Sequence, residues 1–302
     1  GKSSLGSPSN FDVYMKASRS SGSATIANGY TSNWSQYYVM VDAIDVTEHL
    51  RLDLYKGNSL YQAIDVSGDA DITTNFGGLP SGTYTLRYEC RYKKNIFTSN
   101  VYYIYEYVFE VDIDKPTYTL TAGTGTGVNS YYTNKNITYT ASDPNLSYIR
   151  YKHGSDGEYK YSYSGTAVTV LANEENNGFW FFQAYDRLAN ATSIVNRYID
   201  TIAPTGSVET QDRDIISNGG ATNRPFIYNP TDAGSVATVE YKSPKVTSWT
   251  KYPGDTSILT SDGWYYFRAT DGAGNISDEY RVYYDTTNPL GAVFDSATAK
   301  GS

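Results

Sequence analysis

A segment that occurs twice constrains the fold of this chain more than any other feature. YDRLANATSIVNRYIDTIAPTG runs from Tyr185 to Gly206, and TDGAGNISDEYRVYYDTTNPLG runs from Thr270 to Gly291. The glycine, aspartate, asparagine and proline positions keep the same spacing in both copies. Internal repetition of this kind indicates a chain built from successive modules that each close a core of their own.

A more distant copy lies in the first third of the chain. SGTYTLRYEC, which starts at Ser81, resembles NGFWFFQAYD and DGWYYFRATD. FEVDIDKP, which ends at Pro116, resembles RYIDTIAP and VYYDTTNP. The first copy is longer between its glycine and its final aspartate, and we expect KKNIFTSN to form the longer hairpin there.

A period of two after each glycine predicts β-strands. The alternate positions are mostly apolar: Trp180, Phe182 and Ala184; Tyr265, Phe267 and Ala269; Tyr84, Leu86, Tyr88 and Cys90. We expect these positions to face a core, and the intervening positions, such as Gln183 and Arg268, to face water. Cys90 is the only cysteine, so we interpret it as a small buried hydrophobe rather than a reactive thiol.

Composition excludes several classes of protein. The net charge of −8 argues against nucleic acid and anionic membrane surfaces as partners, because both attract basic patches. No run of apolar residues approaches the ~20 that a spanning helix needs. Helix signals are nearly absent, whereas 32 tyrosines favour strands. Short strands separated by turn residues predict β-sandwiches.

The repeated segments DRLAN and DGAGN are predicted to be tight turns between the last two strands of a module. Aspartate accepts bonds from nearby backbone amides, glycine supplies a positive φ, and asparagine tolerates the left-handed region. DTIAP and DTTNP then end the last strand, because proline removes a ladder donor and holds the preceding residue extended.

These motifs resemble the bacterial immunoglobulin-like repeats of Gram-positive surface and secreted proteins. GWYYFRATDGAGNIS…YYDTTNPLG is a close match, whereas the second copy has Ala189 in place of the second glycine. The first copy lacks the Asp-x-x-x-Asn turn. The resemblance implies an exported, wall-associated protein and carries no catalytic residues.

We therefore predict an all-β chain of three tandem immunoglobulin-like β-sandwiches in an extended arrangement. The expected domains are residues 1–115, 116–203 and 204–289, and residues 290–302 are expected to begin a further repeat or to form a disordered tail. A monomer without a cofactor is expected.

The Asp-x-x-x-Asn turns raise the question of a metal. Asp186 with Asn190, and Asp271 with Asn275, supply two side chains per turn, whereas Ca²⁺ takes six to eight oxygen ligands. Further acidity would have to come from Asp200 or Asp285. We interpret the turns as structural and expect no metal site, with Ca²⁺ as the alternative.

Three tyrosines are the candidate ligand contacts. Tyr159, Tyr161 and Tyr163 alternate in EYKYSYSG and fall on one side of a strand. One interpretation is that this side is core or packs on a neighbouring domain. The other is an exposed platform for sugars or a protein partner, since tyrosine offers a large contact area at low entropic cost.

No catalytic constellation emerges from the sequence. One cysteine and two histidines, His49 and His153, provide no zinc set, and no G-x-S-x-G nucleophile motif is present. We expect a non-enzymatic extracellular module, a stalk or adhesin segment that presents a site for cell-wall polysaccharide, host glycan or a surface protein. The alternative is a spacer or carbohydrate-binding array of a larger secreted wall hydrolase or glycosidase.

Overall fold

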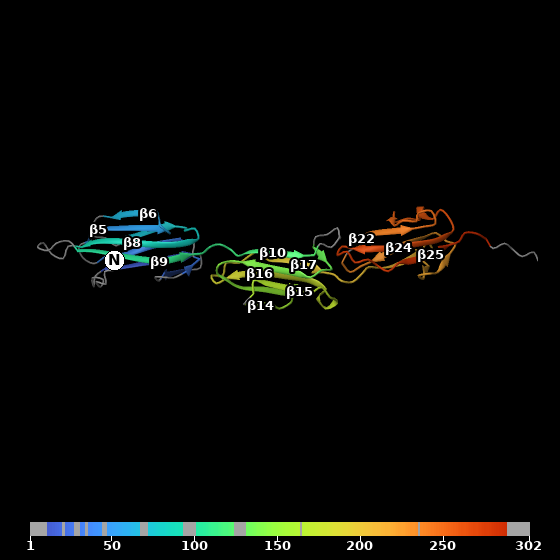
Figure 1. The fold of residues 1–302 in the computed structure, drawn as a ribbon, viewed down its shortest axis with the longest axis horizontal. Helices are drawn as coiled ribbons and strands as arrows, with labels where there is room; N and C mark the ends of the chain where they lie inside the picture. Colours follow the sequence, from blue (N-terminus) through green and yellow to red (C-terminus); the bar gives the residue numbers. More distant parts are fainter. Residues whose placement is uncertain are drawn as a thin grey trace, which may run out of the picture. The chain divides into compact units, whose positions relative to one another are not determined.

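The computed structural model describes residues 11–19, 22–26, 31–33, 36–43, 47–66, 72–92, 101–123, 131–163, 165–234 and 236–288. These residues form 25 β-strands and two 3-10 turns and contain no α-helix. The strands form six sheets, which pair into three immunoglobulin-like β-sandwiches (Figure 1). The all-β prediction is confirmed.

The first sandwich consists of strands β1 to β9. One sheet has four strands in the order β2-β1-β4-β7, and the other has five in the order β3-β9-β8-β5-β6. The strands are β1 (Phe11–Arg19), β2 (Gly22–Ile26), β3 (Thr31–Ser32), β4 (Gln36–Ala43), β5 (Thr47–Lys56), β6 (Ser59–Val66), β7 (Ile72–Gly77), β8 (Gly82–Tyr92) and β9 (Val101–Val111).

The second sandwich consists of strands β10 to β17. Its sheets have the orders β10-β12-β15 and β11-β17-β16-β13-β14. The elements are β10 (Thr117–Ala122), β11 (Tyr132–Thr133), β12 (Ile137–Ser142), β13 (Leu146–His153), β14 (Lys160–Ser162), β15 (Ala167–Val170), the 3-10 turn η1 (Glu174–Asn176), β16 (Gly178–Asp186) and β17 (Val195–Ile199).

The third sandwich repeats this plan with strands β18 to β25. Its sheets have the orders β19-β18-β21 and β20-β25-β24-β22-β23. The elements are β18 (Thr205–Thr210), β19 (Ile215–Ile216), β20 (Ala221–Thr222), β21 (Phe226–Thr231), β22 (Val236–Lys242), β23 (Thr250–Lys251), the 3-10 turn η2 (Thr256–Ile258), β24 (Gly263–Asp271) and β25 (Tyr280–Tyr284).

Each five-stranded sheet has one parallel edge. A short strand lies parallel to the last strand of its sandwich, as β3 to β9, β11 to β17 and β20 to β25. The neighbouring pairs β8–β9, β16–β17 and β24–β25 are antiparallel. The last strand of each sandwich is thus held on both sides before the chain leaves it.

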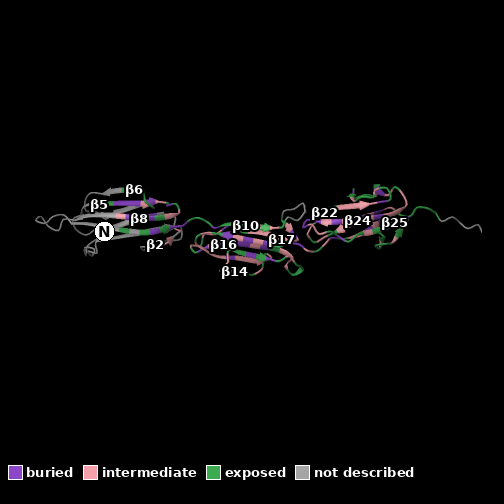
Figure 2. Cartoon of the chain, viewed as in Figure 1, coloured by how far each residue is buried: buried purple, intermediate pink, exposed green. Residues whose placement is uncertain are grey.

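Aromatic side chains from facing sheets fill the cores. In the third sandwich, Phe267 of β24 stacks on Tyr228 of β21, with ring centroids 5.0 Å apart. Tyr139 of β12 stacks in the same way on Phe182 of β16, at 5.5 Å. Buried positions alternate along β24, as the period of two predicts (Figure 2). Burial of this kind is the main stabilising contribution, about 1.5–3 kcal/mol per large apolar side chain.

An aromatic corner recurs two residues after the glycine of each module. Its ring is buried, and its polar atom donates to a carbonyl four residues upstream, which ties the strand to the preceding loop. The bonds run from Tyr84 Oη to Pro80 O (2.7 Å), from Trp180 Nε1 to Asn176 O (2.9 Å) and from Tyr265 Oη to Ser261 O (2.9 Å). Burial, assisted by the neighbouring phenols of Tyr61 and Tyr37, raises the pKa of Tyr84 to about 12.

One of the intervening positions departs from the prediction. Gln183 is buried rather than exposed to water, because Arg150 lies over it and donates to Gln183 Oε1 from Nε at 3.0 Å and from Nη2 at 2.6 Å. Cys90 lies in β8 as predicted, but its side chain, the KKNIFTSN hairpin and residues 289–302 lie outside the described residues.

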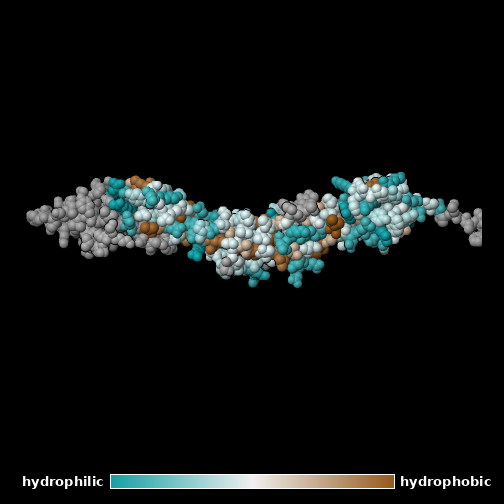
Figure 3. Space-filling model, viewed as in Figure 1, coloured by the Kyte–Doolittle hydropathy of each residue, from teal (hydrophilic) through white to brown (hydrophobic). Residues whose placement is uncertain are grey.

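The exposed large apolar side chains of the described residues come from many different strands and loops. The face drawn in Figure 3 shows single hydrophobic residues among hydrophilic ones. Among the described residues, no helix is long and apolar enough to cross a membrane.

Candidate functional sites

The repeated Asp-x-x-x-Asn segments are tight turns, as predicted. Oδ1 of Asp186 accepts the backbone N–H groups of Leu188 and Asn190, both at 2.8 Å. The second turn has the same bonds, from Ala273 (2.9 Å) and Asn275 (2.8 Å) to Asp271 Oδ1. The aspartate therefore organises the turn through two backbone donors.

The left-handed residue of the turn is not the asparagine. It is the preceding residue, Gly274 with φ 93° and Ala189 with φ 67°. In DGAGN this residue is a glycine, as the sequence analysis expects of a position with positive φ, and in DRLAN it is an alanine. Alanine at such a φ costs roughly 1–2 kcal/mol, so the substitution at Ala189 strains a turn that the chain nevertheless keeps.

The asparagine side chain instead fastens the turn to the preceding linker. Nδ2 of Asn190 donates to Asp186 Oδ2 at 2.7 Å and to the backbone oxygen of Asp112 at 2.9 Å. Nδ2 of Asn275 donates to Asp271 Oδ2 at 2.7 Å and to the backbone oxygen of Asp200 at 2.8 Å. We call this arrangement of turn aspartate, turn asparagine and linker carbonyl the clasp.

A second asparagine supports each clasp from the opposite side. It follows the short parallel strand of the preceding sandwich. Asn134, after β11, donates from Nδ2 to Asn275 Oδ1 at 3.0 Å, and Asn33, after β3, donates to the backbone oxygen of Leu188. Residues 141–149 and 184–193 belong to the same compact unit as the first sandwich. These asparagines lie outside the repeated turn motifs and were not predicted as site residues.

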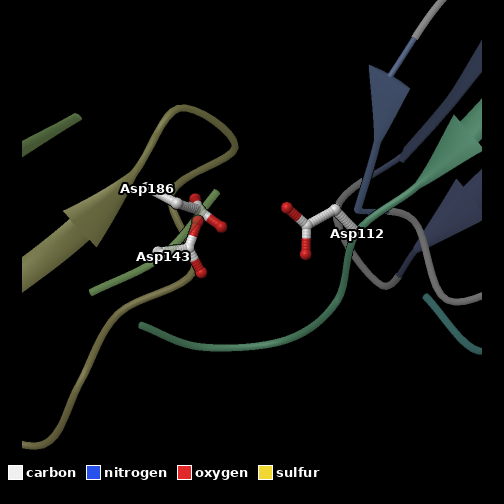
Figure 4. A group of neighbouring side chains, drawn as sticks. All are labelled: Asp112, Asp143 and Asp186. Atoms are coloured by element: carbon white, nitrogen blue, oxygen red, sulfur yellow. The ribbon is translucent and has the colours of Figure 1, made fainter. Parts of the chain in front are cut away.

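Each clasp lies in a cluster of three carboxylates. Asp112, Asp143 and Asp186 form one cluster, and Asp200, Asp232 and Asp271 form the other. In each, one oxygen per residue lies within 4.8 Å of the others. Figure 4 shows Asp112 facing Asp143 and Asp186.

Two members of each cluster are buried. Asp112 and Asp186 are 8% and 2% exposed, and Asp200 and Asp271 are 5% and 0% exposed. Asp112 is also held by Asn145, whose Nδ2 donates to Asp112 Oδ2 at 2.8 Å.

Burial and repulsion by neighbouring carboxylates raise the pKa of one aspartate in each cluster. Desolvation, opposed by the N–H of Asn145 and assisted by the charges of Asp112, Asp186 and Asp114, raises the pKa of Asp143. Desolvation also raises the pKa of Asp200, opposed by the N–H of Ile202 and assisted by Asp232 and Asp271. The charged forms of Asp143 and Asp200 are therefore less favourable than that of a separated aspartate.

Within the part of the chain that the structure describes, these clusters are the groups that could hold a hard cation, since carboxylate oxygens are the ligands that Ca²⁺ prefers. The expectation that Asp200 adds acidity to the Asp271 turn agrees with this geometry. Asp285 joins neither cluster. The oxygens that organise the turns already accept N–H donors, which is what the structural interpretation of the motif requires.

The three candidate tyrosines divide into two groups. Tyr159 is half-buried, with the guanidinium of Arg150 4.2 Å from its ring centroid and Lys152 Nζ at 5.0 Å. Tyr161 and Tyr163 are 48% and 71% exposed, and their rings stack with centroids 5.8 Å apart at an angle of 13°. A core position is therefore wrong for Tyr161 and Tyr163.

Of these two arrangements, the third sandwich repeats only the aromatic ring that lies between two cations. Trp249 lies where Tyr159 does, between Lys242 Nζ at 4.2 Å and the Arg268 guanidinium at 4.4 Å. Lys251 and Pro253 occupy the places of the exposed tyrosines. An aromatic ring between two cations is thus a shared structural feature of the second and third sandwiches. The exposed tyrosine pair occurs in the second sandwich and not in the third.

His153 has a packing role. Its ring stacks on Trp180 with centroids 4.7 Å apart, and its Nε2 lies 2.8 Å from the backbone oxygen of Asn177. The side chain of His49, in β5, lies outside the described residues.

No protein-family model matches the sequence, and no curated protein matches it. Fibronectin(III)-like modules of Clostridium thermocellum CbhA align with 20% identity over 58% of this chain and 90% of theirs, with a TM-score of 0.28. A tetra-tandem repeat from the extending region of a large adhesion protein aligns with 13% identity over 93% of both chains, with a TM-score of 0.28. The Bacteroides ovatus glucan-utilisation protein SGBP-B aligns with 13% identity over 87% of this chain and 67% of its own, with a TM-score of 0.20. Scores of this size carry no information on function.

Proposed function

We propose that this chain is a non-enzymatic segment of a cell-surface or secreted protein, a stalk or adhesin segment that spaces and presents a binding site. Its modules are bounded near Lys115 and Ala203. The observation that supports this proposal is the clasp, which occurs at both linkers with the same atoms in the same roles.

A repeated, fastened linker suits a spacer. A semi-rigid linker that contains proline keeps successive modules in register only when its backbone groups are hydrogen-bonded. Here the linker carbonyl accepts a hydrogen bond from an asparagine side chain of the next module. A catalytic site requires one particular set of reactive side chains in one place, whereas the clasp residues recur at both linkers.

The experiment that tests the spacer role removes both clasps. Small-angle scattering of the full chain should give a larger spread of interatomic distances for Asn190→Ala combined with Asn275→Ala than for the unaltered chain. Asn218→Ala, a change on the exposed side of the third sandwich, is the control. An identical distance distribution in all three proteins would contradict the proposal.

The exposed pair Tyr161 and Tyr163 is the ligand contact that we assign to this segment. Exposed stacked rings offer the flat apolar surface on which a sugar ring or a partner side chain packs. Binding of cell-wall polysaccharide or of an arrayed host glycan should be lost in Tyr161→Ala combined with Tyr163→Ala and retained in Tyr159→Phe. Equal binding by both variants would exclude this pair as the contact.

A further inference from the structure

The end of the third sandwich repeats the surface that the clasp covers at the end of the second. In the second sandwich, the N–H of Asp200 donates to Thr133 O at 2.9 Å, and Thr133 Oγ1 accepts the N–H of Lys135 at 3.1 Å. In the third, the N–H of Asp285 donates to Thr222 O at 3.0 Å, and Thr222 Oγ1 accepts the N–H of Arg224 at 3.0 Å.

The linker that follows is also preset in the same conformation. Asp200 Oδ1 accepts the N–H of Ile202 at 3.2 Å, and Asp285 Oδ1 accepts the N–H of Thr287 at 3.0 Å. The residue before the module glycine holds each linker: Asn177 Oδ1 accepts the N–H of Thr201 at 3.0 Å, and Asp262 Oδ1 accepts the N–H of Thr286 at 2.9 Å.

The two surfaces differ in what covers them. Asp200 is 5% exposed because the Asp271–Asn275 turn lies against it, and Asn134 bonds to that turn. The equivalents at the end of the third sandwich, Asp285 and Asn223, are exposed. The geometry points to a docking face, formed by Asn223 and residues 285–287, for a further β-sandwich that carries an Asp-x-x-x-Asn turn.

The partner is defined by the two occupied examples. It must offer an asparagine amide to the carbonyl of Asp285 and a group that accepts from the amide of Asn223. A second copy of this chain does not supply such a turn, since both described turns are already bonded to Asp112 and Asp200. A module joined through the linker itself is the occupant that fits.

Tethering is also what the energetics require. Few hydrogen bonds form the clasp, and the gain from each is largely offset by the water contacts that its two groups give up. Such a contact is weak between separate molecules but is populated when a short linker sets an effective concentration in the millimolar range. The length of the linker agrees with a tethered partner, because a proline lies four residues after Asp285, as it does after Asp112 and Asp200.

This inference rests on the clasped-spacer function, and the experiment separates the two. Residues 117–200 are appended directly after Pro289, which restores the linker length of the first joint and leaves the segment 280–288 unique. Hydrogen exchange followed by mass spectrometry is then compared with that of the 302-residue chain. The control is the same fusion with Asn190→Ala in the appended copy only.

We expect exchange in residues 285–288 to slow at least tenfold in the fusion and to remain fast in the control. Unchanged exchange there, with the appended core protected, would overturn the docking face. If residues 200–203 also exchange freely in the unaltered chain, the spacer function itself fails. Should the appended copy not protect its core, residues 205–288 are appended instead and distinguished by segmental isotope labelling, with the same two outcomes.

Discussion

Replacing Asn275 by alanine tests the clasp most directly. The change removes the bonds that Asn275 Nδ2 donates to the Asp200 carbonyl and to the Asp271 carboxylate, and it also removes the oxygen that accepts from Asn134 Nδ2. A neutral bond contributes about 1 kcal/mol, and one to a charged group about 1.5–3 kcal/mol. Since Asp271 is fully buried and keeps only its backbone donors, we expect the turn to open more easily by about 2.5–4 kcal/mol.

Native-state hydrogen exchange in increasing denaturant measures this quantity locally. The reporters are the N–H of Asp271, which donates to Asn275 O at 3.0 Å, and the N–H of Ala273. Asn218→Ala is the matched control, because Asn218 also makes two bonds, to Glu279 O and from the Arg281 N–H, but in an exposed place.

The reasoning would be refuted if Asn275→Ala changed the opening free energy no more than Asn218→Ala does. A charge variant adds a second criterion. Asn275→Asp keeps the shape but places a carboxylate beside Asp271, so its destabilisation should be larger at pH 7 than at pH 4. An equal effect at both pH values would mean that the carboxylate cluster does not govern this joint.

Three further outcomes are expected. Ala189→Gly should raise stability by about 1 kcal/mol, because glycine removes the left-handed penalty, and Gly274→Ala should lower it by a similar amount in thermal unfolding. Tyr161→Ala and Tyr163→Ala should each change stability by less than about 0.5 kcal/mol in urea unfolding, since the rings are exposed. The pKa of Asp200 is raised in the folded state, so its charged form opposes folding. Its contribution to stability should therefore rise as pH falls through that raised pKa toward 3.8, and Asp200→Asn should remove this part of the rise in calorimetry while the part due to Asp143 remains.

Local pattern was sufficient to predict the strands and the turns. The alternation after Gly178 and Gly263 predicted the buried set of each strand, because strand side chains point to opposite faces whatever the neighbouring module does. The Asp-x-x-x-Asn turn was predictable for the same reason, since its bonds lie within five residues.

The sites depend on contacts that are distant in sequence and were not predicted. Asp112, Asp143 and Asp232 join the clusters only because the linker and a strand end meet the turn, and no short motif marks such a meeting. The burial of Gln183 depends on Arg150 of another strand. The alternation of a strand shows which side of the sheet a side chain lies on. It does not show whether a residue of the neighbouring strand covers that side chain.

The short parallel strand has a mechanical consequence. Once β10 has detached, tension along the chain pulls the end of β17 in one direction and the start of β11 in the other. Because the two strands run parallel, their connections, among them Tyr198 N–H to Tyr131 O at 2.8 Å, lie across the direction of sliding and must rupture together. The same holds for β20 and β25, where the N–H of Tyr283 donates to Gly220 O at 2.9 Å. After the strands that precede its short parallel strand have detached, such a module resists further pulling by shear rather than unzipping bond by bond.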